Sequence, residues 1–493
     1  MKTAIIGAGM GGLASAVELA AEGHEVVVYE MGDRPGGKVG VASHDGVTFD
    51  TGPSVLTMTD VLAEIFRAAG TTLADEVTLV EADRSFRYLY PDGVALEIYH
   101  DLERTLESVG ETLGGEARDE FDDYLRYAQR IWEAAAPNFI FTEAPTIGSM
   151  VGLGLRKMRA VRDIDPMSKM WPAITSRVDS RHLRWLLARY ATYVGSDPRQ
   201  APATLNCIGW LELGGGTWGV EGGMHSVAEA LEGVARRRGA EFRYETPVRR
   251  IVQRDGAVAG VETDDGVDRC DAVVANAGVA HLVDDLLDGA SGAVDTPDEW
   301  SMSGWTAVLR ARRRPETERP PHTVLFPENY LEEFADIFDR GRPPVAPTVY
   351  LCAQEKAHGR EGWAGEEPIF AMVNAPVESG GSTEPLVWEG LREQVLRRLV
   401  EAELIEESDE IVWERTPTDL AERFPGSRGA IYGASSNSRF SAFQRPANTV
   451  REIPGLYLAG GSAHPGGGVP MCLQSGRLAA GAAKQRSGEA AKQ

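Results

Sequence analysis

Residues 2–20 read KTAIIGAGMGGLASAVELA, a short apolar run, a glycine-rich turn and a second apolar run. This pattern predicts a buried strand, a tight turn and a helix. Gly7 permits the turn, Gly9 lets a pyrophosphate approach the backbone, and Gly12 allows the helix to pack closely on the strand. A second predicted strand ends in Glu30, whose carboxylate can bind a ribose hydroxyl. Glycine also serves ordinary loops, so only the strands, the helix and Glu30 together predict a domain that holds a dinucleotide at a helix N-terminus.

The composition describes a folded protein of two or three domains. The chain has 493 residues, of which 43% are hydrophobic and 25% charged. Its net charge of -24 repels phosphates, which disfavours binding to nucleic acid. The four cysteines show neither CxxC spacing nor a metal-type pattern, and they are Cys207, Cys270, Cys352 and Cys472. We therefore expect reduced thiols, no metal site and a cytoplasmic protein.

Membrane contact is expected to be peripheral. One lysine precedes the first strand directly, so no signal peptide is predicted, and no apolar stretch reaches the length of a membrane-spanning helix. Residues 144–162 lack Asp and Glu, yet combine apolar residues with Arg156, Lys157, Arg159 and Arg162. The region 139–162 is therefore expected to attach to a lipid surface at the inner face of the cell membrane. A buried helix with a solvated basic end is the alternative.

A second glycine pair, Gly36–Gly37, is followed by Lys38 and lies shortly after the predicted ribose-binding acid. Nearby cations could neutralise a diphosphate, whereas the alternative is an exposed basic turn. A nicotinamide enzyme does not need this second pair, but FAD proteins of the glutathione-reductase type commonly extend their fingerprint in this way. FAD is therefore expected rather than NAD.

The rest of the chain alternates between two predicted domains. Residues 86–99 predict a hairpin, 102–189 are helical, and strands are expected at 248–252, 257–262 and 271–277. A final strand, glycine turn and helix span 455–483. The expected fold class is α/β, with a Rossmann-like FAD-binding domain of the glutathione-reductase or amine-oxidase type, an inserted mixed α+β substrate domain and a helical membrane-facing region. The expected parts are an FAD-binding domain (1–85, 215–290 and 440–485), a substrate-binding domain (86–214 and 291–439) with a helical, membrane-associated region at 102–190, and a disordered tail (486–493).

Taken together, the two ends and several motifs between them resemble the carotenoid desaturase family of FAD-dependent oxidoreductases. The likeness is greatest to its 1-hydroxycarotenoid 3,4-desaturase branch, also called hydroxyneurosporene or methoxyneurosporene dehydrogenases. The matching segments are 7–13, 51–58, 189–195, 221–225, 350–354, 423–427 and 457–471. The resemblance implies that FAD is bound by Gly7, Gly9, Gly11, Gly12, Glu30, Gly36, Gly37, Lys38, Val248, Gly460, Gly461, Val469, Pro470 and Met471. Lys38 stands where many relatives carry Arg, so it neutralises phosphate as a point charge.

The resemblance implies that an acyclic 1-hydroxy or 1-methoxy carotenoid gains a C3–C4 double bond, as hydride passes to flavin and the adjacent proton is lost. No catalytic acid or base stands out; His464 is a candidate, although an ordinary loop histidine is the alternative. Tyr193 and Gln354 could recognise a substrate hydroxyl, or could serve packing and backbone bonding. Three other functions stay open: a phytoene desaturase, another amine-oxidase-like flavoenzyme, and a non-enzymatic escort factor for lipidated proteins.

Overall fold

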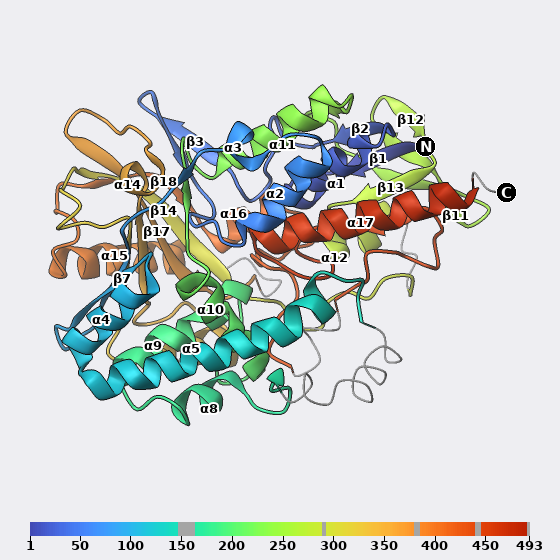
Figure 1. The fold of residues 1–493 in the computed structure, drawn as a ribbon. Helices are drawn as coiled ribbons and strands as arrows, with labels where there is room; N and C mark the ends of the chain where they lie inside the picture. Colours follow the sequence, from blue (N-terminus) through green and yellow to red (C-terminus); the bar gives the residue numbers. More distant parts are fainter. Residues whose placement is uncertain (146–162, 288–291, 379–384, 439–444, 491–493) are drawn as a thin grey trace.

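The computed structural model describes residues 1–145, 163–287, 292–378, 385–438 and 445–490 (Figure 1). A five-stranded parallel sheet forms one side of the molecule. Its strand order is β19 (Leu456–Leu458), β13 (Ala272–Ala275), β1 (Lys2–Ile6), β2 (Glu25–Tyr29) and β9 (Glu241–Arg243). The strands predicted at 2–6 and 26–30 are therefore neighbours at the centre of this sheet. Segments from both chain ends and the middle are needed to complete it.

Helices cover one face of the parallel sheet. They are α1 (Met10–Ala21), α2 (Thr59–Ala68), α11 (His225–Arg237) and α17 (Val469–Ala490). Small residues let α1 and α17 approach closely: Ser15 Oγ donates to the carbonyl of Gly476 at 2.9 Å, and a Cβ on Gly476 would lie 2.2 Å from the Gly11 oxygen. This pair brings the last helix of the chain against the first (Figure 1).

The opposite face of the parallel sheet packs on a three-stranded antiparallel sheet. Its strands are β10 (Arg250–Arg254), β11 (Ala257–Thr263) and β12 (Gly266–Arg269), followed along the chain by α12 (Val279–His281) and a helical turn, Leu282–Leu286. The first two strands confirm the predicted pair, although the first begins two residues later than predicted. β12 was not predicted, because charged residues occupy half of its short length.

A seven-stranded mixed sheet forms the other side of the molecule. Its order is β18 (Glu410–Arg415), β14 (Ser303–Arg312), β17 (Glu366–Ala375), β16 (Val349–Ala353), β15 (His322–Leu325), β6 (Arg84–Leu89) and β7 (Ala95–Tyr99). β6 and β7 are the predicted hairpin, which joins the later strands through parallel pairing of β6 with β15. Apolar side chains of α15 (Pro385–Glu401) cover part of this sheet.

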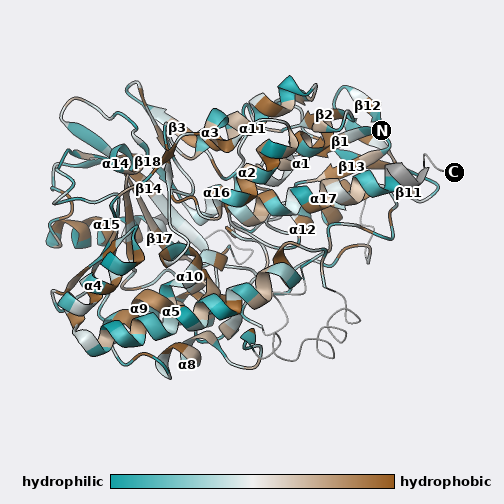
Figure 2. Ribbon diagram, in the orientation of Figure 1, coloured by the Kyte–Doolittle hydropathy of each residue, from teal (hydrophilic) through white to brown (hydrophobic). Residues whose placement is uncertain are grey.

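Helices between β7 and β8 form the predicted helical region. They are α4 (Leu102–Leu113), α5 (Gly115–Ala135), a turn at Ala136–Ile140, α8 (Met170–Thr175), α9 (Arg181–Ala188), turns at Arg189–Val194 and Ala203–Asn206, and α10 (Cys207–Leu213). Figure 2 shows apolar residues on one side of several of these helices, and they share one core with β6 and β7. The charged part of the predicted membrane segment, 146–162, lies outside the described residues. No helix of the described chain is long and apolar enough to cross a membrane.

The remaining short elements complete the fold. They are β3 (Val41–His44), β4 (Val47–Asp50), α3 (Leu73–Glu76), β5 (Leu79–Val80), β8 (Gly219–Val220), α13 (Tyr330–Phe334), a turn at Ala335–Asp339, α14 (Gln354–His358) and α16 (Pro417–Arg423). The predicted disordered tail is corrected in part, because α17 continues to Ala490. Lys484 contributes to this order by bonding Glu18 at 3.1 Å and Glu22 at 2.7 Å.

Candidate functional site

The first glycine turn lies between β1 and α1 at the carboxyl edge of the parallel sheet. Gly7 has φ +91°, and a Cβ on Gly12 would lie 2.1 Å from the Gly7 oxygen, so this turn excludes side chains at Gly12. Gly9 is the N-cap residue of α1. Among the described residues, no side chain caps this helix end and no acidic residue occupies its first turn. The first N–H groups of this helix therefore remain available to an anion.

Glu30 follows β2 and holds the same turn. Its two carboxylate oxygens accept hydrogen bonds from the backbone N–H of Ala8 at 2.7 Å and of Gly32 at 2.8 Å. A carboxylate has about four lone-pair sites, so two backbone bonds leave capacity for the hydroxyls of a ribose. Val248 is placed near this acid, because the backbone N–H of Thr246 donates to the Glu30 carbonyl at 2.9 Å.

The second glycine pair lies directly against the first turn. The N–H of Gly36 donates to the Ala8 carbonyl at 2.8 Å, and a Cβ on Gly37 would lie 3.3 Å from the Gly9 Cα. Gly36 has φ +106°, and a Cβ there would lie 2.3 Å from the Val39 oxygen. Both contacts join residues 28 positions apart, and they bring the two glycine segments together as an extended dinucleotide site requires.

Lys38 is held differently from its predicted phosphate contact. Its ammonium donates to the carbonyls of Ala430 and Ile431, both at 2.8 Å. Burial lowers the pKa of Lys38 to about 8. The Lys38 ammonium thus joins the segment of the second glycine pair to residues 430–431, which follow α16.

Asn276 joins the first and last glycine turns, and sequence reasoning did not select it. Its Nδ2 donates to the Gly7 carbonyl at 3.2 Å. A Cβ on Gly11 would lie 2.7 Å from the Asn276 Oδ1, and a Cβ on Gly460 would lie 2.5 Å from it. The available signal was its position immediately after β13, since ligands of parallel sheets bind at the carboxyl ends of the strands.

The C-terminal turn leads into α17, where the other predicted cofactor residues lie. Gly460 has φ +93°, and its N–H donates to Ser475 Oγ at 3.1 Å, which fixes the turn to the helix. A Cβ on Gly461 would lie 3.4 Å from the Gly467 Cα. The predicted residues of the helix start are Val469, Pro470 and Met471. Because α17 packs on α1, this second helix start lies beside the first.

These features fit a dinucleotide that carries a flavin. The Glu30 carboxylate can bind a ribose hydroxyl, and the uncapped N-terminus of α1 can bind a diphosphate. The C-terminal turn lies against the first turn and can contact a further part of the same molecule. Side chains at Gly9, Gly12 or Gly36 would close the space at the backbone.

Two of the motifs that resemble those of the carotenoid desaturases, 221–225 and 350–354, meet in one buried knot around Asp50, the residue before a third, 51–58. Its carboxylate accepts from the N–H of Met224 at 2.7 Å and from Arg360 at 3.1 Å. Gln354 binds the Asp50 backbone at both ends, accepting from its N–H at 2.8 Å and donating to its carbonyl at 2.9 Å. Of the two interpretations of Gln354, the structure supports backbone bonding. The knot fixes the loop that follows β4.

That loop also contacts the seven-stranded sheet. Ser54 Oγ lies 2.6 Å from the hydroxyl of Tyr350, which lies 2.8 Å from Nδ1 of His322. Burial lowers the pKa of His322 well below its ordinary value, so this ring is neutral at pH 7. These two hydrogen bonds connect the segment that follows the second glycine pair with strands β15 and β16.

His464 has the bonding of an ordinary loop histidine. Its Nε2 lies 2.9 Å from the Thr142 carbonyl, and its own carbonyl accepts from Asn448 at 2.9 Å and from Ser475 Oγ at 2.6 Å. Burial lowers the pKa of His464. These contacts give it a structural task, and no catalytic role is assigned to it.

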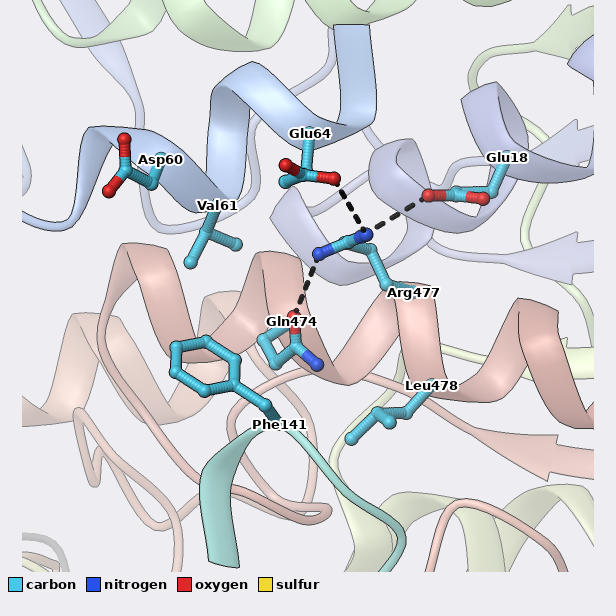
Figure 3. A pocket seen from close by; sticks show the side chains of 8 residues that line it. All are labelled: Glu18, Asp60, Val61, Glu64, Phe141, Gln474, Arg477 and Leu478. Atoms are coloured by element: carbon cyan, nitrogen blue, oxygen red, sulfur yellow. Dashed lines mark hydrogen bonds and ion pairs between the residues drawn. The ribbon is translucent and has the colours of Figure 1, made fainter. Parts of the chain in front are cut away.

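An open hollow of about 470 Å³ lies away from the glycine turns, over α1, α2 and α17. Figure 3 shows Arg477 between Glu18 and Glu64, with Phe141 on the other side of the hollow. The arginine lies 3.2 Å from the Glu18 carboxylate and 3.8 Å from the Glu64 carboxylate. The charged groups of this hollow thus bind one another, and it takes no part in the cofactor site.

Comparisons with known proteins agree with this geometry. The sequence model of the family described as flavin containing amine oxidoreductase matches residues 10–315. A hydroxyneurosporene desaturase from Rubrivivax gelatinosus is 38% identical, over 97% of this chain and 92% of the relative. A 1-hydroxycarotenoid 3,4-desaturase from Flavobacterium sp. is 30% identical, over 97% of this chain and 98% of the relative.

Among solved structures, a putrescine oxidase with bound putrescine aligns with a TM-score of 0.62 at 15% identity, covering 99% of both chains. This confirms the predicted α/β amine-oxidase type of fold, while the membrane-facing region stays a prediction. The turn geometry and the near-full-length matches lead to one conclusion: the chain belongs to the family of flavin-containing amine oxidoreductases and is an FAD-dependent oxidoreductase.

Proposed function

We propose that this protein is a carotenoid desaturase that introduces the C3–C4 double bond into an acyclic 1-hydroxy or 1-methoxy carotenoid. The near-full-length likeness to a hydroxyneurosporene desaturase and a 1-hydroxycarotenoid 3,4-desaturase supports this substrate class. The observation that carries the proposal is this near-full-length likeness. The core that β6 shares with the helical region is rich in aromatic rings that pack on one another, and they include Phe86, Tyr88, Tyr90, Trp185, Phe326 and Tyr330.

The bound flavin supplies the hydride acceptor of this reaction. The chain binds and orients it, with residues 1–85, 215–290 and 440–485 as the FAD-binding domain and 86–214 and 291–439 as the substrate-binding domain. Lys38 holds the second glycine pair in place through the carbonyls of Ala430 and Ile431. The proposed FAD contacts are Gly7, Gly9, Gly11, Gly12, Glu30, Gly36, Gly37, Val248, Gly460, Gly461, Val469, Pro470 and Met471. Their meeting at one edge of the parallel sheet supports this assignment.

Assay in liposomes with added FAD tests the proposal. A 1-hydroxycarotenoid should lose two hydrogens and show a red shift in absorption, because its conjugation lengthens by one double bond, whereas phytoene should react poorly. Efficient conversion of phytoene with no change in the hydroxylated carotenoid would move the protein to the phytoene desaturases. A product that gains oxygen, or release of peroxide from an amine, would contradict the proposal.

We further propose that the protein attaches peripherally to lipid, in the cell at the inner face of the cytoplasmic membrane. Two large apolar side chains are exposed here, Phe141 at 43% within the predicted region 139–162 and Met167 at 70% just after it. Their insertion would bury apolar surface at the lipid boundary. Flotation with liposomes tests this: Phe141→Ser with Met167→Ser should lower the bound fraction, while Val345→Ser, at an exposed residue elsewhere, should not. Equal flotation of all three proteins would sink this proposal.

A further inference from the structure

A buried group of five side chains lies where the helical region meets β6. We name it the tyrosine–arginine junction, and its members are Tyr88, Arg189, Tyr190, Tyr193 and Glu212. Tyr190 donates to Glu212 Oε1 at 3.0 Å and Tyr193 donates to Glu212 Oε2. Arg189 donates to the hydroxyls of Tyr88 at 3.1 Å and Tyr193 at 3.4 Å. These bonds form a polar network beside the apolar core that β6 shares with the helical region.

The junction fixes the direction of each hydrogen bond. Burial raises the pKa of Tyr193 well above its ordinary value, so the phenol keeps its proton. Burial also raises the pKa of Glu212, while the guanidinium of Arg189, 3.9 Å away, and both phenols favour its carboxylate form. Arg189 can only donate to the Tyr193 oxygen, so the proton of Tyr193 points to its other partner, Glu212 Oε2. The Tyr193 oxygen then offers a partner only a lone pair.

Accessibility separates Tyr193 from its neighbours. Tyr88 and Tyr190 are 0% exposed, whereas Tyr193 is half-buried and keeps accessible surface. Among the phenols of the junction, only Tyr193 can therefore meet a bound molecule.

The turn that carries Tyr193 approaches the C-terminal cofactor turn. It spans Arg189–Val194 and is capped by Gly195. A Cβ on Gly195 would lie 2.9 Å from Tyr432, and a Cβ on Gly467 would lie 2.8 Å from the same ring. Tyr432 thus lies between Gly195, two residues after Tyr193, and the turn before α17. A substrate whose reacting carbons are three and four bonds from its terminal hydroxyl oxygen needs the partner of that hydroxyl near the flavin.

We infer that Tyr193 is a specificity-determining residue whose oxygen accepts a hydrogen bond from the terminal hydroxyl of the carotenoid, so that the enzyme prefers 1-hydroxy over 1-methoxy substrates. The inference rests on the proposed function and narrows it. A methyl ether has no hydrogen to donate and would face the lone pair of Tyr193 with its own. Arg189 and Glu212 act as positioning residues, because they set the direction of the Tyr193 hydroxyl.

The test measures kcat/KM of the FAD-loaded enzyme in liposomes for a 1-hydroxycarotenoid and its 1-methoxy counterpart. Wild type should favour the hydroxyl by about tenfold, the worth of one hydrogen bond in a water-excluded site. Tyr193→Phe should lower the ratio towards one while its rate on the methoxy substrate changes little. Tyr190→Phe is the matched control, since it removes a bond to the same carboxylate from an inaccessible ring, and it should keep the ratio.

Glu212→Gln gives a second measurement if Tyr193→Phe folds poorly. An amide N–H can donate to Tyr193 and free the phenol proton, so the preference should shift towards the methoxy substrate with the ring retained. Equal wild-type rates on both substrates, or equal loss of preference in Tyr190→Phe and Tyr193→Phe, would overturn the inference. Conversion of neither carotenoid by wild type would instead overturn the proposed function, which keeps the two failures distinct.

Discussion

Replacing Glu30 by alanine should weaken FAD binding more than any other single carboxylate change near the first turn. In the structure this carboxylate already accepts two backbone hydrogen bonds, from Ala8 at 2.7 Å and Gly32 at 2.8 Å, which hold it beside the turn. A charge-assisted hydrogen bond to a ribose hydroxyl contributes about 1.5 to 3 kcal/mol. Its loss corresponds to an increase in Kd of roughly 10- to 150-fold.

The same change should also destabilise the apoprotein. It leaves the N–H of Ala8 without its carboxylate partner, which costs about 1–3 kcal/mol if water does not replace it. Glu25→Ala is the matched control on the same strand. Its side chain is 66% exposed and pairs with Lys2 at 3.3 Å, and such surface pairs contribute about 0–1 kcal/mol.

The assay titrates FAD into the apoprotein and follows flavin fluorescence, with a urea melt of each apoprotein beside it. Glu30→Gln should fall between wild type and Glu30→Ala, because its amide keeps one acceptor oxygen. If Glu30→Ala and Glu25→Ala bound FAD with the same Kd, the ribose assignment of Glu30 would be refuted. If Glu30→Ala had a lower urea midpoint but an unchanged Kd for FAD, Glu30 would stabilise the turn without binding the ribose.

Three further predictions concern Gly36 of the second glycine pair, Gln354 of the buried knot, and the buried His358 at the end of α14. Gly36→Ala should reduce retained flavin and lower the Tm, because its Cβ has no room, whereas Gly46→Ala, with φ +78° and open space, should cost only about 1 kcal/mol. Gln354→Leu should lower the free energy of unfolding by about 2–6 kcal/mol in a urea melt, since the buried N–H and carbonyl of Asp50 both lose their partner. Burial lowers the pKa of His358 to about 4. The unfolded chain therefore takes up a proton below about pH 6.5 that the folded chain refuses until about pH 4. His358 should contribute about 2 kcal/mol to the stability that wild type loses between pH 7 and pH 5, so His358→Gln should lose less by about that amount; equal losses would contradict this.

The local sequence determined the first strand, turn and helix, because the apolar periodicity and the glycines of residues 2–20 act over short distances. The same holds for the hairpin of β6 and β7 and for the strand, turn and helix at the C-terminal end. Residue spacing was also enough to select Glu30 and the second glycine pair, which lie beside the first turn as predicted.

Only the tertiary structure decided which distant side chains meet. Asn276 follows one strand and Gly460 another, and parallel pairing of β13 with β1 and β19 brings them to one point. Gln354 was interpreted as a possible substrate group, but the fold places it on the backbone of Asp50, 304 residues away. Neither periodicity nor composition encodes such pairings, because they arise from sheet register and helix packing. The direction of the Tyr193 hydrogen bond likewise depends on Glu212, which a different helix supplies.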